Sequence, residues 1–310
     1  MAGRRWVGGW ICVGLMTTAC GVIDGSSDCD EVFFVGSEGD RLTPSYDVYA
    51  YDEHGDQTKR LTDDHASIDA VVSPDGEQMV VRSWRGSPFD AELGPETVSL
   101  YLSDIDGDNE QRLTTGHSDD YPAWSPDGTR IAFLRREDNP DISKLLVVDL
   151  AHPSTTTVVV TFPRSVFLPI IWLDNETVAW WRHRPRSVVS RDASGTGPTS
   201  VVARVPNFPV WSPDRTKIAY SELAYSLSPG FQLYQVVVRD LDSGQVTPVA
   251  DSASGQTGAL GWTKDDRLFF YRSITGEDVH IKVAEDGGLE PSSVVGTLGE
   301  VSVTMNPACG

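Results

Sequence analysis

Two histidines occupy equivalent positions in a recurring pattern and stand beside acidic residues. His65 and His117 each lie eight residues before the serine of a Ser-Pro-Asp-Gly phrase. The neighbouring acids are Asp63, Asp64, Asp119 and Asp120. Imidazole nitrogens and carboxylate oxygens bind divalent metals, so His65 and His117 are candidate ligands of a metal or catalytic site. The alternative is that such loops are ordinarily polar, since no third histidine occupies the equivalent position elsewhere.

A second acidic run excludes one kind of metal site. Asp104, Asp106 and Asp108 surround Gly107 in a pattern that begins like a calcium loop. An EF-hand loop requires glycine at its sixth position and glutamate at its twelfth. Here the glycine is fourth and the twelfth residue is Thr115, so the run is predicted to form a hairpin turn.

One basic and aromatic cluster stands out in this acidic protein. Its members, the candidate residues for partner contact, are Trp181, Arg182, His183, Arg184 and Arg186. Tryptophan and arginine are favoured anchors of protein interfaces, which makes the cluster a candidate binding surface. The alternative is that Trp180 belongs to the core and that the arginines only solvate a long loop reaching residues 195–197.

The overall charge restricts the classes of partner. The chain has 25 Lys and Arg against 45 Asp and Glu, which gives a formal net charge of −20. Nucleic-acid phosphates require a basic stripe, so we expect no nucleic-acid partner. The chain also lacks the Gly-x-Ser-x-Gly nucleophile motif of many hydrolases. The absence of this motif favours a protein without catalytic activity, and we expect no cofactor. A divalent metal at the two histidines is the alternative.

The candidate residues must be positioned by a repeat. The phrases that recur are 72–76, 124–128 and 211–215, with degenerate copies at Trp172 and Trp262. Their spacing of about 40–50 residues is typical of solenoids and propellers. Each phrase precedes a short apolar run, and between phrases lie alternating β-branched and aromatic runs followed by Asp-Gly turns. Each repeat is therefore predicted to be four antiparallel strands.

These residues resemble the TolB-type β-propeller repeat, with its Trp-Ser-Pro-Asp-Gly turn, Ile-Ala-Phe strand and Leu-Tyr strand. The resemblance covers about residues 30–307 and implies an all-β, six-bladed propeller. Segments 31–35 and 48–62 supply three strands of the first blade, and 301–307 is predicted to close the ring as its innermost strand. Similar propellers include metal-using polysaccharide lyases, while the TolB-type itself implies a protein-binding component of the cell envelope.

The N-terminus has the features of an export signal. Arg4 and Arg5 precede an apolar stretch and small residues that end before Cys20. This resembles a bacterial lipobox, so we expect residues 1–19 to be removed, Cys20 to be lipidated and 20–28 to be a tether. The alternative is plain secretion after cleavage behind Ala19. Residues 29–310 then form the propeller.

The two remaining cysteines test the ring. On the repeat, Cys29 and Cys309 fall at the same turn of the closing blade, so we predict a disulfide between them. The expected function is a membrane-tethered, monomeric scaffold that binds a protein partner in the bacterial cell envelope. The alternative is a carbohydrate-active enzyme or glycan-binding module that uses a polar or metal site in the propeller funnel.

Overall fold

The computed structural model describes fifteen stretches of the chain. They are residues 31–38, 45–52, 57–85, 87, 89–90, 94–95, 97–115, 118–137, 142–163, 170–228, 231–249, 256–262, 266–273, 279–284 and 293–298. Every regular element in them is a strand, which confirms the all-β class. No helix long and apolar enough to cross a membrane occurs among these residues.

The strands form one three-stranded and five four-stranded antiparallel sheets, numbered I to VI in chain order. Sheet I contains β1 (Glu31–Glu38), β2 (Ser45–Asp52) and β3 (Gln57–Arg60). Sheet II contains β4 (Ser67–Val72), β5 (Gln78–Ser83), β8 (Ser99–Asp104) and β9 (Gln111–Arg112). Sheet III contains β10 (Ser118–Trp124), β11 (Arg130–Arg136), β12 (Ser143–Asp149) and β13 (Thr156–Phe162).

The remaining sheets repeat the same order. Sheet IV contains β14 (Ile170–Trp172), β15 (Thr177–His183), β16 (Arg186–Asp192) and β17 (Ser200–Ala203). Sheet V contains β18 (Val210–Trp211), β19 (Lys217–Ser228), β20 (Phe231–Asp240) and β21 (Val246–Pro248). Sheet VI contains β22 (Gln256–Trp262), β23 (Leu268–Ser273), β24 (Val279–Ala284) and β25 (Ser293–Leu298). A small extra hairpin pairs β6 (Phe89–Asp90) with β7 (Gly94–Pro95).

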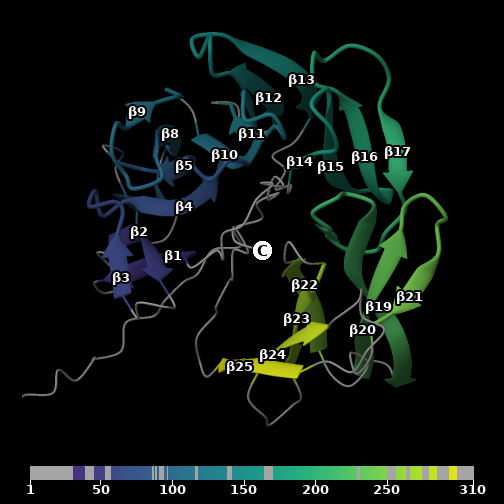
Figure 1. Ribbon diagram of the computed structural model, residues 1–310. Coiled ribbons are helices and arrows are strands. Elements are labelled where there is room, and N and C mark those ends of the chain that lie inside the picture. Colours follow the sequence, from purple (N-terminus) through teal and green to yellow (C-terminus); the bar gives the residue numbers. More distant parts are fainter. Residues whose placement is uncertain are drawn as a thin grey trace, which may run out of the picture.

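The sheets are arranged around a common centre in chain order (Figure 1). Neighbouring sheets touch through β2 and β4, β4 and β10, β10 and β14, and β20 and β22. The prediction of four strands per repeat is confirmed for sheets II to VI, and that of three strands in the first repeat for sheet I. The predicted closing strand 301–307, the signal and tether, and the cysteines Cys20, Cys29 and Cys309 lie outside the described residues.

The recurring phrase builds the same turn each time. At the end of β10, the Ser125 hydroxyl donates to Asp127 Oδ1 at 2.6 Å and accepts from the Arg130 backbone N–H at 2.9 Å. The Thr129 N–H also donates to Asp127, and Gly128 adopts a φ of 69°, where glycine is favoured. Partial burial raises the pKa of Asp127, but these hydrogen bonds outweigh it and hold the pKa below its ordinary value.

The copies of this turn confirm that the phrase is structural. The corresponding pairs Ser73–Asp75 and Ser212–Asp214 make the same hydroxyl-to-carboxylate bond, at 2.5 and 2.6 Å. The third copy has Arg215 in place of glycine, at a φ of 61°. All three phrases therefore close the link between an innermost strand and the strand that follows it.

Two tryptophans at the first position of the phrase join sheets III and IV to the sheet before each of them. Trp124 Nε1 donates to the Val71 carbonyl at 2.9 Å, and Trp172 Nε1 donates to the Ala123 carbonyl at 3.0 Å. The Trp172 indole is fully buried and carries the Arg130 guanidinium of sheet III over its ring, 5.0 Å from the centroid. The apolar core follows the same plan, because its clusters lie between sheets, as where Val71 packs with Trp124.

The joining hydrogen bond predicts a measurable difference between two tryptophans. Trp172→Phe leaves the buried Ala123 carbonyl without its donor, whereas Trp262 Nε1 is buried and has no acceptor among the described residues. Both changes shrink a buried ring, so Trp262→Phe is the matched control. We expect Trp172→Phe to lower the free energy of unfolding in urea by about 1–3 kcal/mol more than Trp262→Phe. Equal losses would contradict the role of the bond.

Candidate functional site

The antiparallel order of the strands gives the molecule two distinct faces. The innermost strands begin at one face, here called the start face, and end at the Ser-Pro-Asp turns of the opposite face, here called the turn face. The β5–β8, β11–β12 and β15–β16 connections also lie at the start face, because adjacent strands run in opposite directions. Every candidate site residue that is described lies at this face or near it.

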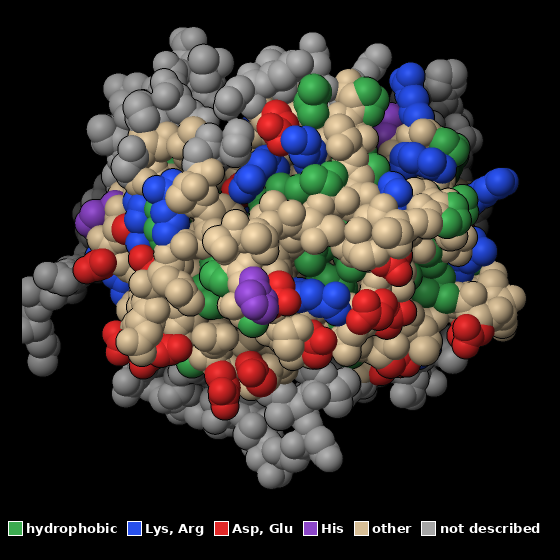
Figure 2. All heavy atoms as spheres, turned by 90° about the horizontal axis from the view of Figure 1, so that it is seen from above, with side chains coloured by type: hydrophobic (Ala, Val, Ile, Leu, Met, Phe, Trp, Pro, Cys, Tyr) green, Lys and Arg blue, Asp and Glu red, His purple; other side chains and the backbone are tan. Residues whose placement is uncertain are grey.

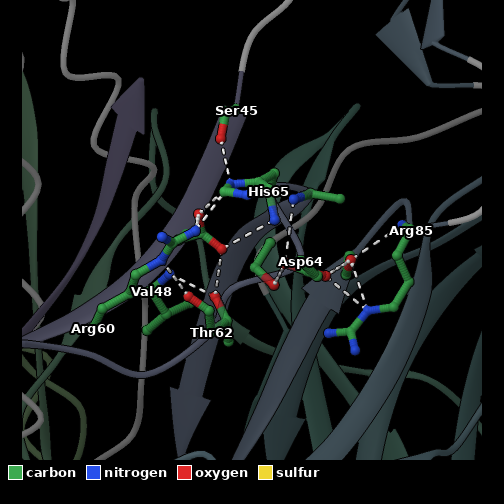
Figure 3. A network of polar contacts seen from close by, with 11 residues as sticks. Ser45, Val48, Arg60, Thr62, Asp64, His65 and Arg85 are labelled. Carbon is green, nitrogen blue, oxygen red and sulfur yellow. Dashed lines mark hydrogen bonds and ion pairs between the residues drawn. The ribbon is translucent and has the colours of Figure 1, made fainter. Parts of the chain in front are cut away.

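His65 is held by three polar groups that meet at one ring nitrogen (Figure 3). Ser45 Oγ lies 2.8 Å, Arg60 Nη2 2.9 Å and Asp47 Oδ2 3.2 Å from His65 Nδ1. In a Ser-His-Asp triad the acid and the hydroxyl bind opposite ring nitrogens. The three residue types are therefore present without the geometry of a nucleophile relay, and the Arg60 cation disfavours a metal ion at this nitrogen.

The polar network around His65 ties the β3–β4 connection to sheet I. Asp47 is almost fully buried, pairs with Arg60 and accepts bonds from the Thr62 hydroxyl and the His65 N–H, both at 3.1 Å. Thr62 Oγ1 in turn accepts from the Val48 N–H at 2.9 Å. The next repeat makes the equivalent bond at 3.0 Å, from the Leu100 N–H to Thr114 Oγ1. This recurrence identifies the network as part of the scaffold.

Asp64, the acid beside His65, is also committed to the scaffold. It accepts bonds from the hydroxyls of Ser67 at 2.8 Å and Ser83 at 2.6 Å, and it pairs with Arg85 Nε at 2.7 Å. Burial raises the pKa of Asp64, but these donors and the Ala66 N–H outweigh it and hold the pKa below its usual range. The carboxylate thus fixes the start of β4 relative to the end of β5, which meet at the start face.

Asp119 forms the most enclosed ion pair of the start face. Its side chain is fully buried and binds Arg135 through two bonds of 2.8 Å, one to Nε and one to Nη2. Hydrogen bonding to Asp119 raises the pKa of Arg135 above its ordinary value. A bidentate pair of this kind is among the strongest polar contacts in proteins and leaves no carboxylate free for a metal.

A chain of four charges crosses from sheet II to sheet III. Arg82 lies 3.4 Å from Asp69 Oδ2 and 3.2 Å from Asp120 Oδ1, and Arg136 lies 3.2 Å from Asp120 Oδ2. Burial raises the pKa of Asp69 to about 6; Arg82 opposes the rise and the Asp120 charge adds to it. Tyr121, beside Asp120, has a φ of 55°, which is rare for a bulky residue and coincides with the bulge in β10.

The predicted metal site remains a prediction. His117 lies outside the described residues, so its distance to His65 is not defined. Of the neighbouring acids, Asp64, Asp119 and Asp120 are each held by an arginine. Within the stretches given above, no group of three or more His, Cys, Asp or Glu side chains is placed to hold a metal ion.

The basic cluster forms a tight hairpin. The prediction of a long loop after Trp181 is wrong, because β15 continues to His183 and pairs there with Arg186, the first residue of β16. Trp181 is only 6 % exposed and belongs to the core between sheets IV and V. The groups that reach solvent are His183, Arg184 and Arg186, with Arg182 half-buried.

Phe208 adds an aromatic group that the sequence reasoning missed. It lies between β17 and β18 at the start face and is 51 % exposed. Its ring centroid is 4.4 Å from that of Trp181, which lies 5.5 Å from the His183 ring. The only signal in the sequence is an aromatic residue in a polar connection, Asn207-Phe208-Pro209, ahead of an innermost strand.

No protein-family model matches the sequence, and no curated protein matches it. Solved structures do. TolB from Acinetobacter baumannii is 16 % identical, with a TM-score of 0.59 over 84 % of this chain and 63 % of that one. The β-propeller domain of the Trilobed protease from Pyrococcus furiosus is 13 % identical, with a TM-score of 0.61 over 88 % and 82 % of the two chains. The fold is a TolB-like β-propeller.

Other propellers with this fold have different activities. An oligogalacturonate lyase in complex with manganese is 16 % identical, with a TM-score of 0.61 over 86 % of this chain and 74 % of that one. The present chain spans less than two thirds of the length of the Acinetobacter TolB chain. Because different activities share this fold, the function must be argued from particular side chains rather than from the fold.

The raised pKa of Asp69 predicts how the stability of the propeller depends on pH. The folded protein retains the Asp69 proton up to about pH 6, whereas the unfolded chain releases it near the ordinary pKa of 3.8. Stability from this group is therefore present at low pH and is lost as the pH rises from about 4 to about 6. For a shift of about two units, the loss is about 3 kcal/mol.

Urea unfolding of the wild type and Asp69→Asn at several pH values measures this loss. The free energy of the wild type minus that of Asp69→Asn is expected to fall by about 2–3 kcal/mol between about pH 4 and pH 6.5. Asp242→Asn, an exposed change at the turn face, is the control and should show no such trend. A difference that does not vary with pH would contradict the raised pKa.

Proposed function

We propose that this protein is a non-catalytic, membrane-tethered β-propeller that binds a protein partner in the bacterial cell envelope. Its N-terminal sequence supports export and a lipid anchor at Cys20, and its repeat resembles the TolB type. The fold supplies a rigid platform, because its sheets are joined by buried tryptophans and core clusters. The binding surface is assigned to the start face.

The same proposal includes a closed ring of six blades. Sheet I has three strands where its neighbours have four, and β1 pairs with β2 on one side only among the described residues. Segment 301–307 has the apolar alternation of an innermost strand and would complete this sheet. A disulfide between Cys29 and Cys309 would then lock the first and last segments together.

The observation that carries the proposal is the uneven distribution of charge. In the edge-on view of Figure 2, Lys and Arg side chains lie mainly in the upper half and Asp and Glu mainly in the lower half. Turn formation explains the acids of the turn face. Each carboxylate of Asp127, Asp192 and Asp240 accepts a hydrogen bond from a serine hydroxyl in its own turn. Among the described residues, no comparable hydrogen bonding to carboxylates accounts for the cations of the sheet IV hairpin.

Three arginines near the start face of sheets I to III differ from this hairpin. Arg60, Arg85 and Arg135 are each neutralised by a buried or half-buried acid. Within the described part of the chain, no acid pairs with Arg182, His183, Arg184 or Arg186. A net charge of −20 makes free cations unusual, so we assign this cluster to contact with a partner.

Site-specific photo-crosslinking in intact cells of the source bacterium tests the function. A photoreactive amino acid replaces Arg184 at the start face or, as the matched control, exposed Asp242 at the turn face. We expect the first position to give a discrete cross-linked protein, identified by mass spectrometry, and the second to give none. Cross-linking from neither position, or from Asp242 alone, would contradict the proposal.

A further inference from the structure

The strand register places an aromatic and basic surface on one side of the sheet IV hairpin. His183 pairs with Arg186, and Trp181 pairs with Val188 two residues away, so these side chains share the face that looks toward sheet V. Phe208 reaches the same place from the β17–β18 connection and packs on Trp181. We call the exposed part of this surface, His183, Arg184, Arg186 and Phe208, the hairpin surface.

The charges of the hairpin surface are unfavourable for the isolated fold. His183 stands directly opposite Arg186, and Arg184 lies in the two-residue turn between them. Arg184 and Arg186 place two like charges within three residues of the same turn, and these charges repel each other. Residue types that destabilise the fold locally are expected at positions that serve a function.

Phe208 is only partly covered, and the Trp181 indole beneath it lacks a hydrogen-bond partner among the described residues. Phe208 leaves about half of its surface in water although its other side rests on the Trp181 ring. Trp181 is more than nine-tenths buried, and its Nε1 has no hydrogen-bond partner among the described residues. An exposed ring on a rigid aromatic base, rimmed by cations, is the composition of a binding hot spot.

We propose that the hairpin surface binds an acidic protein segment that places one apolar side chain against Phe208 and its carboxylates beside Arg184 and Arg186. The inference rests on the proposed function and names the class of partner. Charge complementarity favours an acidic segment. The chain as a whole is acidic and repels such a segment, whereas the cations of the hairpin surface attract it. A narrow segment fits better than an anionic membrane, because a flat membrane approaching the start face would also meet the exposed Asp63.

The test uses a fluorescein-labelled peptide of twelve residues, Asp and Glu throughout with one central leucine. Fluorescence anisotropy measures its binding to the mature chain at low and at physiological salt. We expect saturable binding that weakens with salt, is reduced at least about tenfold in Arg184→Glu/Arg186→Glu, and is reduced about fivefold in Phe208→Ala. The matched controls are Lys59→Glu, an exposed charge on β3, and Val201→Ala, an exposed apolar side chain on β17, and neither should change binding.

A second peptide, with serine in place of the leucine, tests the apolar contact itself. Phe208→Ala should weaken the binding of the leucine peptide and leave the binding of the serine peptide unchanged, because only the leucine peptide has an apolar side chain that contacts Phe208. Equal effects on both peptides would overturn the proposed contact. Loss of binding in Lys59→Glu as large as in the arginine variant would also overturn the proposal, because it would show attraction by charge alone.

The outcomes separate this inference from the proposed function. Vesicles of phosphatidylglycerol that bind the chain through Arg184 and Arg186, while the peptides do not, would replace the acidic segment with a membrane surface. A cross-linked partner at Arg184 without peptide binding would retain the proposed function and overturn this inference. Peptide binding without any cross-linked partner would retain the hairpin surface and overturn the envelope scaffold.

Discussion

The structure depends on the connection between successive sheets, in which a buried indole N–H reaches a carbonyl of the sheet before it. Trp124 and Trp172 make this bond, and the cation Arg130 extends over the second ring. A single four-stranded sheet has two apolar faces and cannot bury both alone, so the cores form between sheets. The Ser-Pro-Asp turn sets the place where each tryptophan meets its neighbour. The same contact thus recurs at two successive junctions, II–III and III–IV.

Features that depend on local sequence were predictable, whereas those that depend on long-range pairing were not. Proline, glycine and serine at fixed spacing determine the turns, so the four-stranded repeats follow from the sequence. The end of β15 depends on the pairing of His183 with Arg186, which the sequence pattern does not reveal. The exposure of Phe208 depends on where the β17–β18 connection passes over Trp181. The binding of His65 to Asp47 joins the β3–β4 connection to β2, eighteen residues away in the sequence.

The start face combines two uses of charge. On sheets I to III, Arg60 and Arg135 hold the buried carboxylates of Asp47 and Asp119, and these pairs tie β2 to β3 and β10 to β11. Removing one partner of a buried pair is costly, which makes such residues poor candidates for contact with a ligand. On sheet IV the cations have no such partner among the described residues and lie beside an exposed ring. This difference between neighbouring sheets separates the scaffold pairs from the binding surface that we propose.

We infer that partners dock at the start face of sheet IV. Hydrogen–deuterium exchange of the chain in its native membrane complex, compared with the purified chain, measures this most directly. We predict added protection of the backbone in residues 181–187 and 205–209, with exchange at the turns 125–129 and 240–244 unchanged. Protection confined to those turns, or spread equally over both faces, would contradict the account.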